Sequence, residues 1–124
     1  MISFAESGVR KAILSFPPGS SGGSDGLTPQ HLKDLITSEG TSGNLLAAIT
    51  SLVNILMDGT IPTEIRPFFF GGRLIALLKK GGGIRPIVVG LCLRRVASKL
   101  VSSLATNKLS PVFAPLQLGV GVSR

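Results

Sequence analysis

Apolar residues recur at helical spacing in four stretches of the chain. These stretches are 3–14, 29–36, 44–57 and 92–106, and apolar positions three and four residues apart predict an amphipathic helix in each. Thr28 followed by Pro29 predicts the start of the second helix, because threonine caps helices and proline fits their first turn. Asn44 is predicted to cap the third helix, and Gly59 lies just past its end.

Between the third and fourth helices the pattern changes to that of a β-hairpin. Two aliphatic runs, 73–79 and 84–89, flank three glycines at 81–83, so two strands and a turn are predicted over residues 73–89. Pro86 cannot donate a ladder hydrogen bond, which predicts an edge strand or a bulge there. The predicted fold class is therefore α+β, with helices packed around a small β-hairpin.

Charge is divided unequally between the two halves of the chain. All six acidic residues occur at or before Glu64, and ten basic residues follow it without any acid. These ten are Arg66, Arg73, Lys79, Lys80, Arg85, Arg94, Arg95, Lys99, Lys108 and Arg124. Because like charges repel, such segregation disfavours folding unless a polyanionic partner neutralises it. A nucleotide or a nucleic acid is therefore the predicted partner.

Composition excludes several kinds of site. With one cysteine, Cys92, and one histidine, His31, the chain cannot form an internal disulfide or a His/Cys zinc site. Cys92 is predicted to be a buried hydrophobe, and His31 a solvated or hydrogen-bonded helical residue. The Gly-rich stretch 19–26 lacks the Gly-Lys-Ser/Thr of a Walker loop, and Asp25 there is expected to make a local turn bond. No carboxylates occur at Asp-x-Asp spacing, so no metal site is predicted.

No secretory signal or membrane span is apparent in the sequence. The N-terminus lacks a basic region followed by an apolar stretch, and the longest uncharged run, 40–57, has helical periodicity and polar residues. The chain is expected to be intracellular, cytoplasmic or nuclear, with no membrane partner.

The hairpin holds the sharpest candidate site. A three-residue turn would place Lys79 directly opposite Arg85, and a two-residue turn would place Lys80 there. Like charges facing each other across a sheet are destabilising, and a bound phosphate would remove that penalty. The alternative is a solvated hairpin whose long basic side chains extend into water. Arg94, Arg95 and Lys99 of the basic amphipathic helix 92–106 are expected either to continue this phosphate-binding surface or to be a solvated helix face.

Four segments carry a resemblance to a known family. They are Gly-Gly-Ser-Asp-Gly-Leu (22–27), Leu-Ile-Ala-Leu-Leu-Lys-Lys-Gly-Gly-Gly-Ile-Arg-Pro-Ile (74–87), Val-Gly-Leu-Cys-Leu-Arg-Arg-Val-Ala-Ser-Lys (89–99) and Ala-Pro-Leu-Gln-Leu-Gly-Val-Gly-Val (114–122). Their succession resembles the fingers region of reverse transcriptases (RNA-directed DNA polymerases) from non-long-terminal-repeat, LINE-like retrotransposons. The resemblance implies that Lys79 or Lys80, together with Arg85, contacts the triphosphate of an incoming nucleotide. It implies that Lys99 matches a lysine of the following helix, and that Gln117 and Gly119 match a Gln-x-Gly element near the template path.

Two departures from the family pattern qualify this resemblance. Ser24 stands where the family more often has proline in a Gly-Pro-Asp-Gly loop, and the sequence stops at Arg124, before the palm and its catalytic aspartates. The resemblance thus implies an incomplete reverse transcriptase domain over residues 1–124, the fingers subdomain without the palm. The full-length family would use Mg²⁺, but no catalytic residue, metal ligand or cofactor is expected in this chain.

Three functional hypotheses follow. The first is a retrotransposon reverse transcriptase fragment that binds nucleotide or nucleic-acid phosphates and does not polymerise alone; its partners would be an RNA or DNA template-primer and a nucleoside triphosphate. The second is a free-standing basic nucleic-acid-binding module without catalytic activity. The third is a helical interaction protein whose apolar stripe from Leu93 to Leu104 docks onto a partner.

Overall fold

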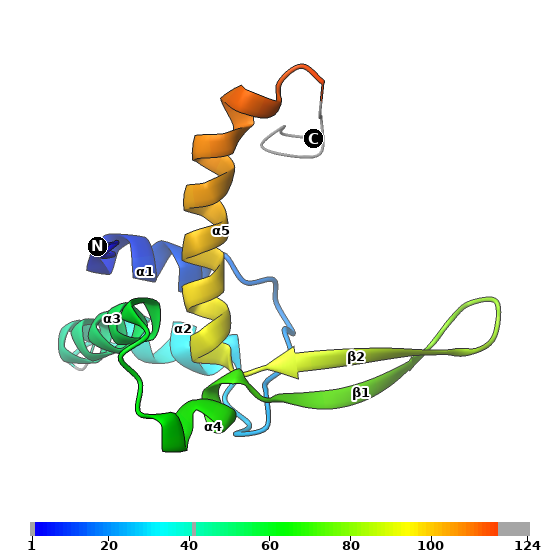
Figure 1. Ribbon diagram of the computed structural model, residues 1–124. Coiled ribbons are helices and arrows are strands. Elements are labelled where there is room, and N and C mark those ends of the chain that lie inside the picture. Colours follow the sequence, from blue (N-terminus) through cyan, green and yellow to red (C-terminus); the bar gives the residue numbers. More distant parts are fainter. Residues whose placement is uncertain (1, 41, 117–124) are drawn as a thin grey trace.

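The computed structural model describes residues 2–40 and 42–116. Within them the chain forms an α+β fold of five α-helices, one short 3-10 helix and a two-stranded antiparallel hairpin (Figure 1). The α+β class predicted from the sequence is confirmed, but the prediction that the helices pack around the hairpin is wrong: the core contains helical residues and Phe16, and the hairpin projects from it (Figure 1).

The N-terminal half is helical. It contains α1 (Glu6–Leu14), α2 (Pro29–Thr37) and α3 (Ser42–Asp58). The second helix begins where predicted, since the Thr28 hydroxyl accepts a hydrogen bond from the His31 backbone N–H at 3.3 Å. In return, the imidazole Nδ1 of His31 accepts from the Thr28 N–H at 3.2 Å, which completes a capping box. α3 begins two residues before Asn44, so the prediction that Asn44 caps it is wrong.

The hairpin and the last helix follow two short helices. These elements are η1 (Thr63–Ile65), α4 (Arg66–Phe70), β1 (Gly72–Leu78), β2 (Ile84–Gly90) and α5 (Cys92–Phe113). The sequence pattern did not predict η1 or α4, in which Pro67 occupies the first turn, where its missing N–H is tolerated. α5 extends past the predicted end at residue 106 and includes Pro111 in its last turn. Since neither glycine nor proline interrupts residues 92–110, nothing local stops this helix earlier.

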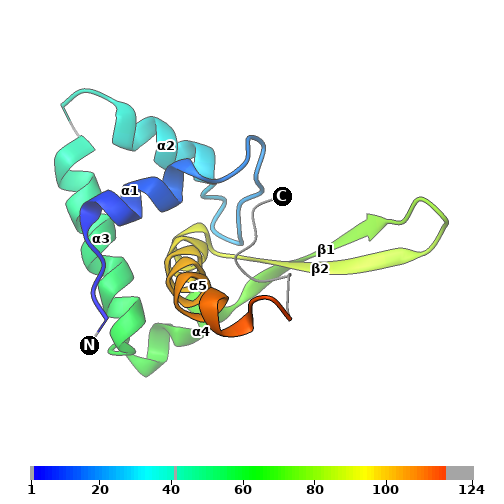
Figure 2. The same ribbon diagram turned by 90° about the horizontal axis from the view of Figure 1, so that it is seen from above.

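The hydrophobic core lies between α1, α2, α3 and the N-terminal half of α5 (Figure 2). Its buried members are Val9, Ala12, Ile13, Phe16, Leu32, Ile36, Leu46, Ile49, Val53, Cys92, Val96, Ala97 and Leu100. Val96, Ala97 and Leu100 belong to the stripe that the third hypothesis assigned to a separate partner. That hypothesis is wrong for these residues, because they are buried in the chain's own core.

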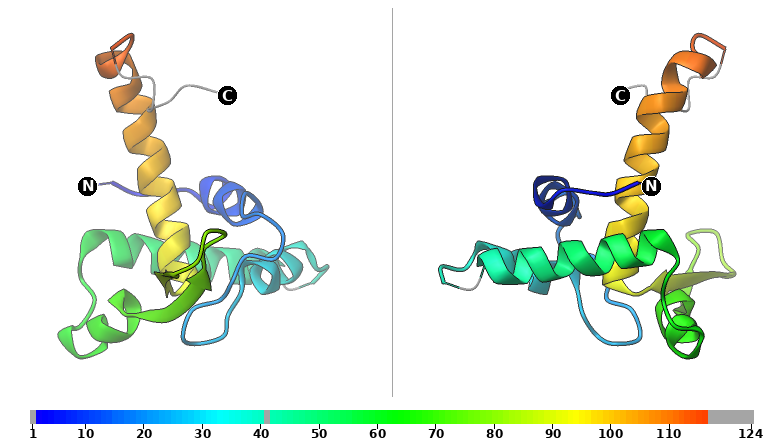
Figure 3. Two further views of the ribbon diagram at one scale, coloured as in Figure 1. Left: turned by 90° about the vertical axis from the view of Figure 1, so that its right-hand side faces the viewer. Right: turned by 60° about the vertical axis from the view of Figure 1, so that its left-hand side comes forward.

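Two segments project from this core. The hairpin extends away from α1, α2 and α3, and the C-terminal half of α5 rises beyond the other helices (Figures 1 and 3).

Among the described residues no single helix has both the length and the hydrophobicity to cross a bilayer. Only α3 and Thr63–Phe70 taken together reach that length and hydrophobicity, and the two are bent by 102° relative to each other.

Candidate nucleic-acid interface

The tip of the hairpin is a turn whose backbone favours glycine. The Lys79 N–H donates to the Gly83 carbonyl at 3.0 Å, and the Gly82 N–H donates to the Lys79 carbonyl at 3.1 Å. Gly82 and Gly83 have φ angles of 86° and 88°, in the left-handed region that side chains disfavour. The loop therefore consists of Lys80, Gly81 and Gly82, with Lys80 inside the turn itself.

The strand register differs from the one expected. Arg85 pairs with Leu77, so the prediction that Lys79 or Lys80 lies directly opposite Arg85 is wrong. The observed register is shifted by two residues from a pairing of Lys79 with Arg85, and this shift separates two like charges that would destabilise the sheet. Because side chains alternate with a period of two, Lys79 and Arg85 stay on the same face, in diagonal positions.

The alternation of side chains gives the hairpin two unlike faces. One face carries the cations Arg73, Lys79 and Arg85 together with the exposed Leu77 and the half-buried Ile75, Ile87 and Val89. The other face is entirely apolar and consists of Leu74, Ala76, Leu78, Ile84, Pro86 and Val88. Its side chains are open to solvent: Leu78 is 87% exposed and Leu74 70%.

The cations of the hairpin are free. Among residues 2–40 and 42–116, the exposed side chains of Arg73, Lys79, Lys80 and Arg85 have no hydrogen-bond or ion-pair partner. Arginine and lysine side chains in this state present all of their N–H donors to solvent. The hairpin is thus a projecting element with four positive charges that no described residue compensates.

Two arginines of α5, by contrast, bind backbone carbonyls inside the protein. Arg94 Nη1 donates to the Phe70 carbonyl at 3.1 Å, and Arg95 Nη1 donates to the Ser21 carbonyl at 2.6 Å. A Cβ at Gly90 would overlap the Arg94 guanidinium, so glycine at this position lets the side chain cross the end of β2. The two arginines tie α5 to α4 and to the Gly-rich loop.

Phe16 anchors two cations of the same helix. The Arg95 guanidinium carbon lies 5.1 Å from the centre of the Phe16 ring, and Lys99 Nζ lies 4.5 Å from it, both within cation–π range. Lys99 also donates to the Ser15 hydroxyl at 3.1 Å. The predicted continuous surface therefore divides into two sets of cations. Those of the hairpin have no partner among the described residues, whereas Arg94, Arg95 and Lys99 of α5 contact other groups of the protein.

The Gly-rich loop packs against the base of the hairpin. A Cβ at Gly23 would lie 2.9 Å from the carbonyl oxygen of Gly90 and 2.9 Å from the Cα of Leu91, so only glycine permits this backbone contact. Asp25 Oδ1 accepts from the Leu27 N–H at 3.1 Å, which confirms the predicted local turn bond. The loop has a packing role, and its carboxylate is committed to the turn.

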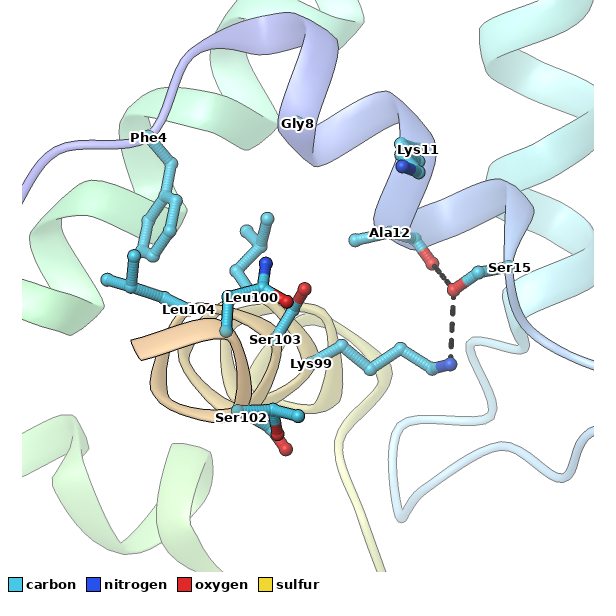
Figure 4. Close-up of a pocket in the computed structure, with 12 residues that line it drawn as sticks. Phe4, Gly8, Lys11, Ala12, Ser15, Lys99, Leu100, Ser102, Ser103 and Leu104 are labelled. Carbon is cyan, nitrogen blue, oxygen red and sulfur yellow. Dashed lines mark hydrogen bonds between the residues drawn. The ribbon is translucent and has the colours of Figure 1, made fainter. Parts of the chain in front are cut away.

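A groove that sequence reasoning missed runs between α1 and the middle of α5. It has a volume of about 600 Å³ and is lined from α1 by Gly8, Lys11 and Ala12, with Phe4 before the helix and Ser15 directly after it. From α5 come Lys99, Leu100, Leu104 and neighbouring serine, threonine and asparagine residues. Figure 4 shows Phe4 facing Leu104 at one end, while the Lys99 side chain reaches Ser15 at the other. Lys11 and Lys99 are far apart in sequence, so only the fold brings them together.

The remaining chemically active groups are sequestered or dispersed. Cys92 is fully buried, as predicted, and burial raises the pKa of its thiol above the ordinary value. In the part of the chain that the structure describes, no three His, Cys, Asp or Glu side chains gather into a group that could hold a metal ion.

Gln117 and Gly119, the residues that resemble the Gln-x-Gly element, lie outside the described residues. Comparisons of the chain with protein-family models, with curated proteins and with solved structures find no match. The function is therefore inferred from the residues and their arrangement.

Proposed function

We propose that this chain binds the phosphates of a nucleotide or nucleic acid through its hairpin, as a fingers-like element similar to that of non-LTR retrotransposon reverse transcriptases. One observation carries this proposal: Arg73, Lys79, Lys80 and Arg85 project on an exposed hairpin without any partner among the described residues. A polyanion would supply the charge-assisted hydrogen bonds that these side chains lack.

The basis for phosphate binding differs from the one that the sequence suggested. Directly opposed cations are absent from the ladder, so relief of cross-strand repulsion no longer supports the proposal. Diagonal placement of Lys79 and Arg85 on one face, with Lys80 in the turn beside them, still lets three cations approach one phosphodiester or triphosphate group. The resemblance in residues 74–87 assigns a triphosphate to the same side chains.

The proposed partners are a single-stranded RNA or DNA template, its primer and a nucleoside triphosphate. The 124-residue chain alone is proposed to bind without polymerising, since the sequence has no counterpart of the family's paired aspartates. Incorporation of nucleotides by the purified chain on a primed template would overturn this part of the proposal.

Salt-dependent binding to a fluorescein-labelled single-stranded RNA of twelve nucleotides tests the hairpin. Four phosphate contacts predict a slope of log K against log salt of about −2.8, since each contact with a single strand adds about −0.7. The double variant Lys79→Ala with Arg85→Ala should lose most of the binding and make the slope shallower by about 1.4.

Lys108→Ala is the matched control, because Lys108 of α5 is exposed, lies away from the hairpin and has no partner in the described part of the chain. If the control lowers affinity per charge removed as much as the double variant does, binding is diffuse and the hairpin is not the site. Circular dichroism of each variant establishes that the fold is retained.

A free-standing nucleic-acid-binding module is the second candidate. The buried cluster shared by α1, α2, α3 and α5 favours it, because such a core can support independent folding. This candidate predicts one cooperative thermal transition of the isolated chain. Gradual melting with binding of a hydrophobic dye at room temperature would count against it.

A further inference from the structure

We propose that the groove between α1 and α5 binds one nucleotide unit of a single-stranded nucleic acid, with its phosphate at Lys11 and Lys99 and its base against Phe4. This site is separate from the hairpin and uses Lys11, which no sequence motif singled out. The inference rests on the proposed function only in taking the polyanion to be a nucleic acid.

The cationic end of the groove is built from two helices. Lys11 lies in the last turn of α1, exposed and without a partner among the described residues, and Lys99 extends from α5. Lys99 Nζ donates to the Ser15 hydroxyl at 3.1 Å and lies 4.5 Å from the centre of the Phe16 ring, and both contacts hold its ammonium beside the groove. Its other N–H groups have no hydrogen-bond partner among the described residues. Among the described residues that line the groove there is no carboxylate to neutralise either lysine. A phosphate between them would accept charge-assisted hydrogen bonds from both.

The apolar end holds an aromatic residue whose backbone is fixed. Asn54 of α3 binds both backbone groups of Phe4: its Oδ1 accepts from the Phe4 N–H at 2.8 Å, and its Nδ2 donates to the Phe4 carbonyl at 3.1 Å. The Phe4 side chain is half-buried and faces Leu104 across the groove (Figure 4). A held aromatic ring with an accessible part is a platform for a nucleobase, and base–aromatic stacking is tolerant of base identity.

The two ends of the groove lie on opposite sides of α5 seen along its axis (Figure 4). Lys99 and Leu104 are also five residues apart on that helix, about 7.5 Å along its axis. The groove volume of about 600 Å³ also lies within the usual range for small-molecule sites. Ser103 and Asn107 on the groove wall offer hydrogen-bonding groups for a ribose or a base edge. Inorganic phosphate would occupy only the cationic end, whereas a nucleotide covers both.

Adenosine 5′-monophosphate, titrated into isotope-labelled protein and followed by amide chemical shifts, tests the site directly. The amides of Gly8, Ser15 and Ser103 should shift as the nucleotide binds. Lys11→Gln should weaken the fitted Kd about fivefold, and Lys108→Gln, which removes the same charge outside the groove, should change it less than twofold.

Phe4→Leu separates stacking from charge. It keeps an apolar side chain at the groove and should weaken adenosine 5′-monophosphate binding about fivefold while leaving inorganic phosphate binding unchanged. Lys11→Gln changes an exposed side chain without a partner, so it tests the site even if Phe4→Leu fails to fold.

Three results would overturn the inference. Shifts confined to residues 73–89 would place the nucleotide at the hairpin only. Equal effects of Lys11→Gln and Lys108→Gln would show that the groove lysine acts through net charge. Inorganic phosphate binding as tight as the nucleotide would eliminate the base contact. The hairpin double variant, assayed with the RNA oligonucleotide, reports on the proposed function separately, so failure of one leaves the other standing.

Discussion

Replacing Asn54 with alanine removes the clamp that holds the segment before α1 against α3. The Asn54 amide makes two hydrogen bonds to the backbone of Phe4, at 2.8 and 3.1 Å, across fifty positions of the sequence. Each bond of this kind contributes about 1 kcal/mol net, so their loss should lower the free energy of unfolding by about 2 kcal/mol. Alanine has a higher helix propensity than asparagine, which raises the free energy of unfolding by about 0.5 kcal/mol. The expected net loss is about 1.5 kcal/mol, or about 6 °C in Tm for a chain of this length.

Thermal unfolding followed by circular dichroism measures this loss, with Asn44→Ala as the control. Asn44 lies exposed in the same helix, so its replacement reports the gain in helix propensity without the clamp. Asn54→Ala should therefore melt well below both the parent chain and Asn44→Ala. Equal melting of the two variants would show that the Phe4 backbone is not held by Asn54, and would remove the support for a fixed aromatic ring in the groove.

Two further predictions concern the base of the hairpin and the buried thiol. Gly23→Ala forces a Cβ to within 2.9 Å of the Gly90 carbonyl and should cost about 1–3 kcal/mol by urea unfolding, whereas Gly43→Ala, with open space around it, should not destabilise. Equal urea midpoints for Gly23→Ala and Gly43→Ala would refute the close packing of the loop. Because burial raises the pKa of the Cys92 thiol, iodoacetamide at pH 8 should label the unfolded chain at least about tenfold faster than the folded one. Stability should also fall as pH rises through the ordinary thiol range, since the unfolded chain ionises first; equal labelling rates would contradict the burial.

Local signals predicted the elements whose boundaries depend on adjacent residues. Thr28 and Pro29 mark the start of α2 because a cap and a first-turn proline act over a few positions. The register of the hairpin was not predictable in the same way, since three consecutive glycines permit several turns and most strand residues are aliphatic. The structure adopts the pairing that places Arg85 opposite Leu77, an outcome decided by cross-strand neighbours and not by the turn sequence alone.

The same limit applies to the candidate sites. Counting charges identified a cationic half, but it could not distinguish Lys79, which has no partner within 2–40 and 42–116, from Arg95, which binds the Ser21 carbonyl seventy-four positions away. Nor could it find the groove, because Lys11 and Lys99 are brought together only by the packing of α1 on α5. Chain-distant contacts of this kind leave no periodic trace in a sequence.

Leu91 is the single residue between β2 and α5, and it is almost completely buried. Its carbonyl accepts a hydrogen bond from the Arg95 N–H in the first turn of the helix. The Gly23 backbone packs so closely that a Cβ there would lie 2.9 Å from the Leu91 Cα. With so short and so confined a joint, the direction in which the hairpin projects is set by the first turn of α5. A substitution that displaced Leu91 would thus re-aim both strands even with every residue of the hairpin unchanged.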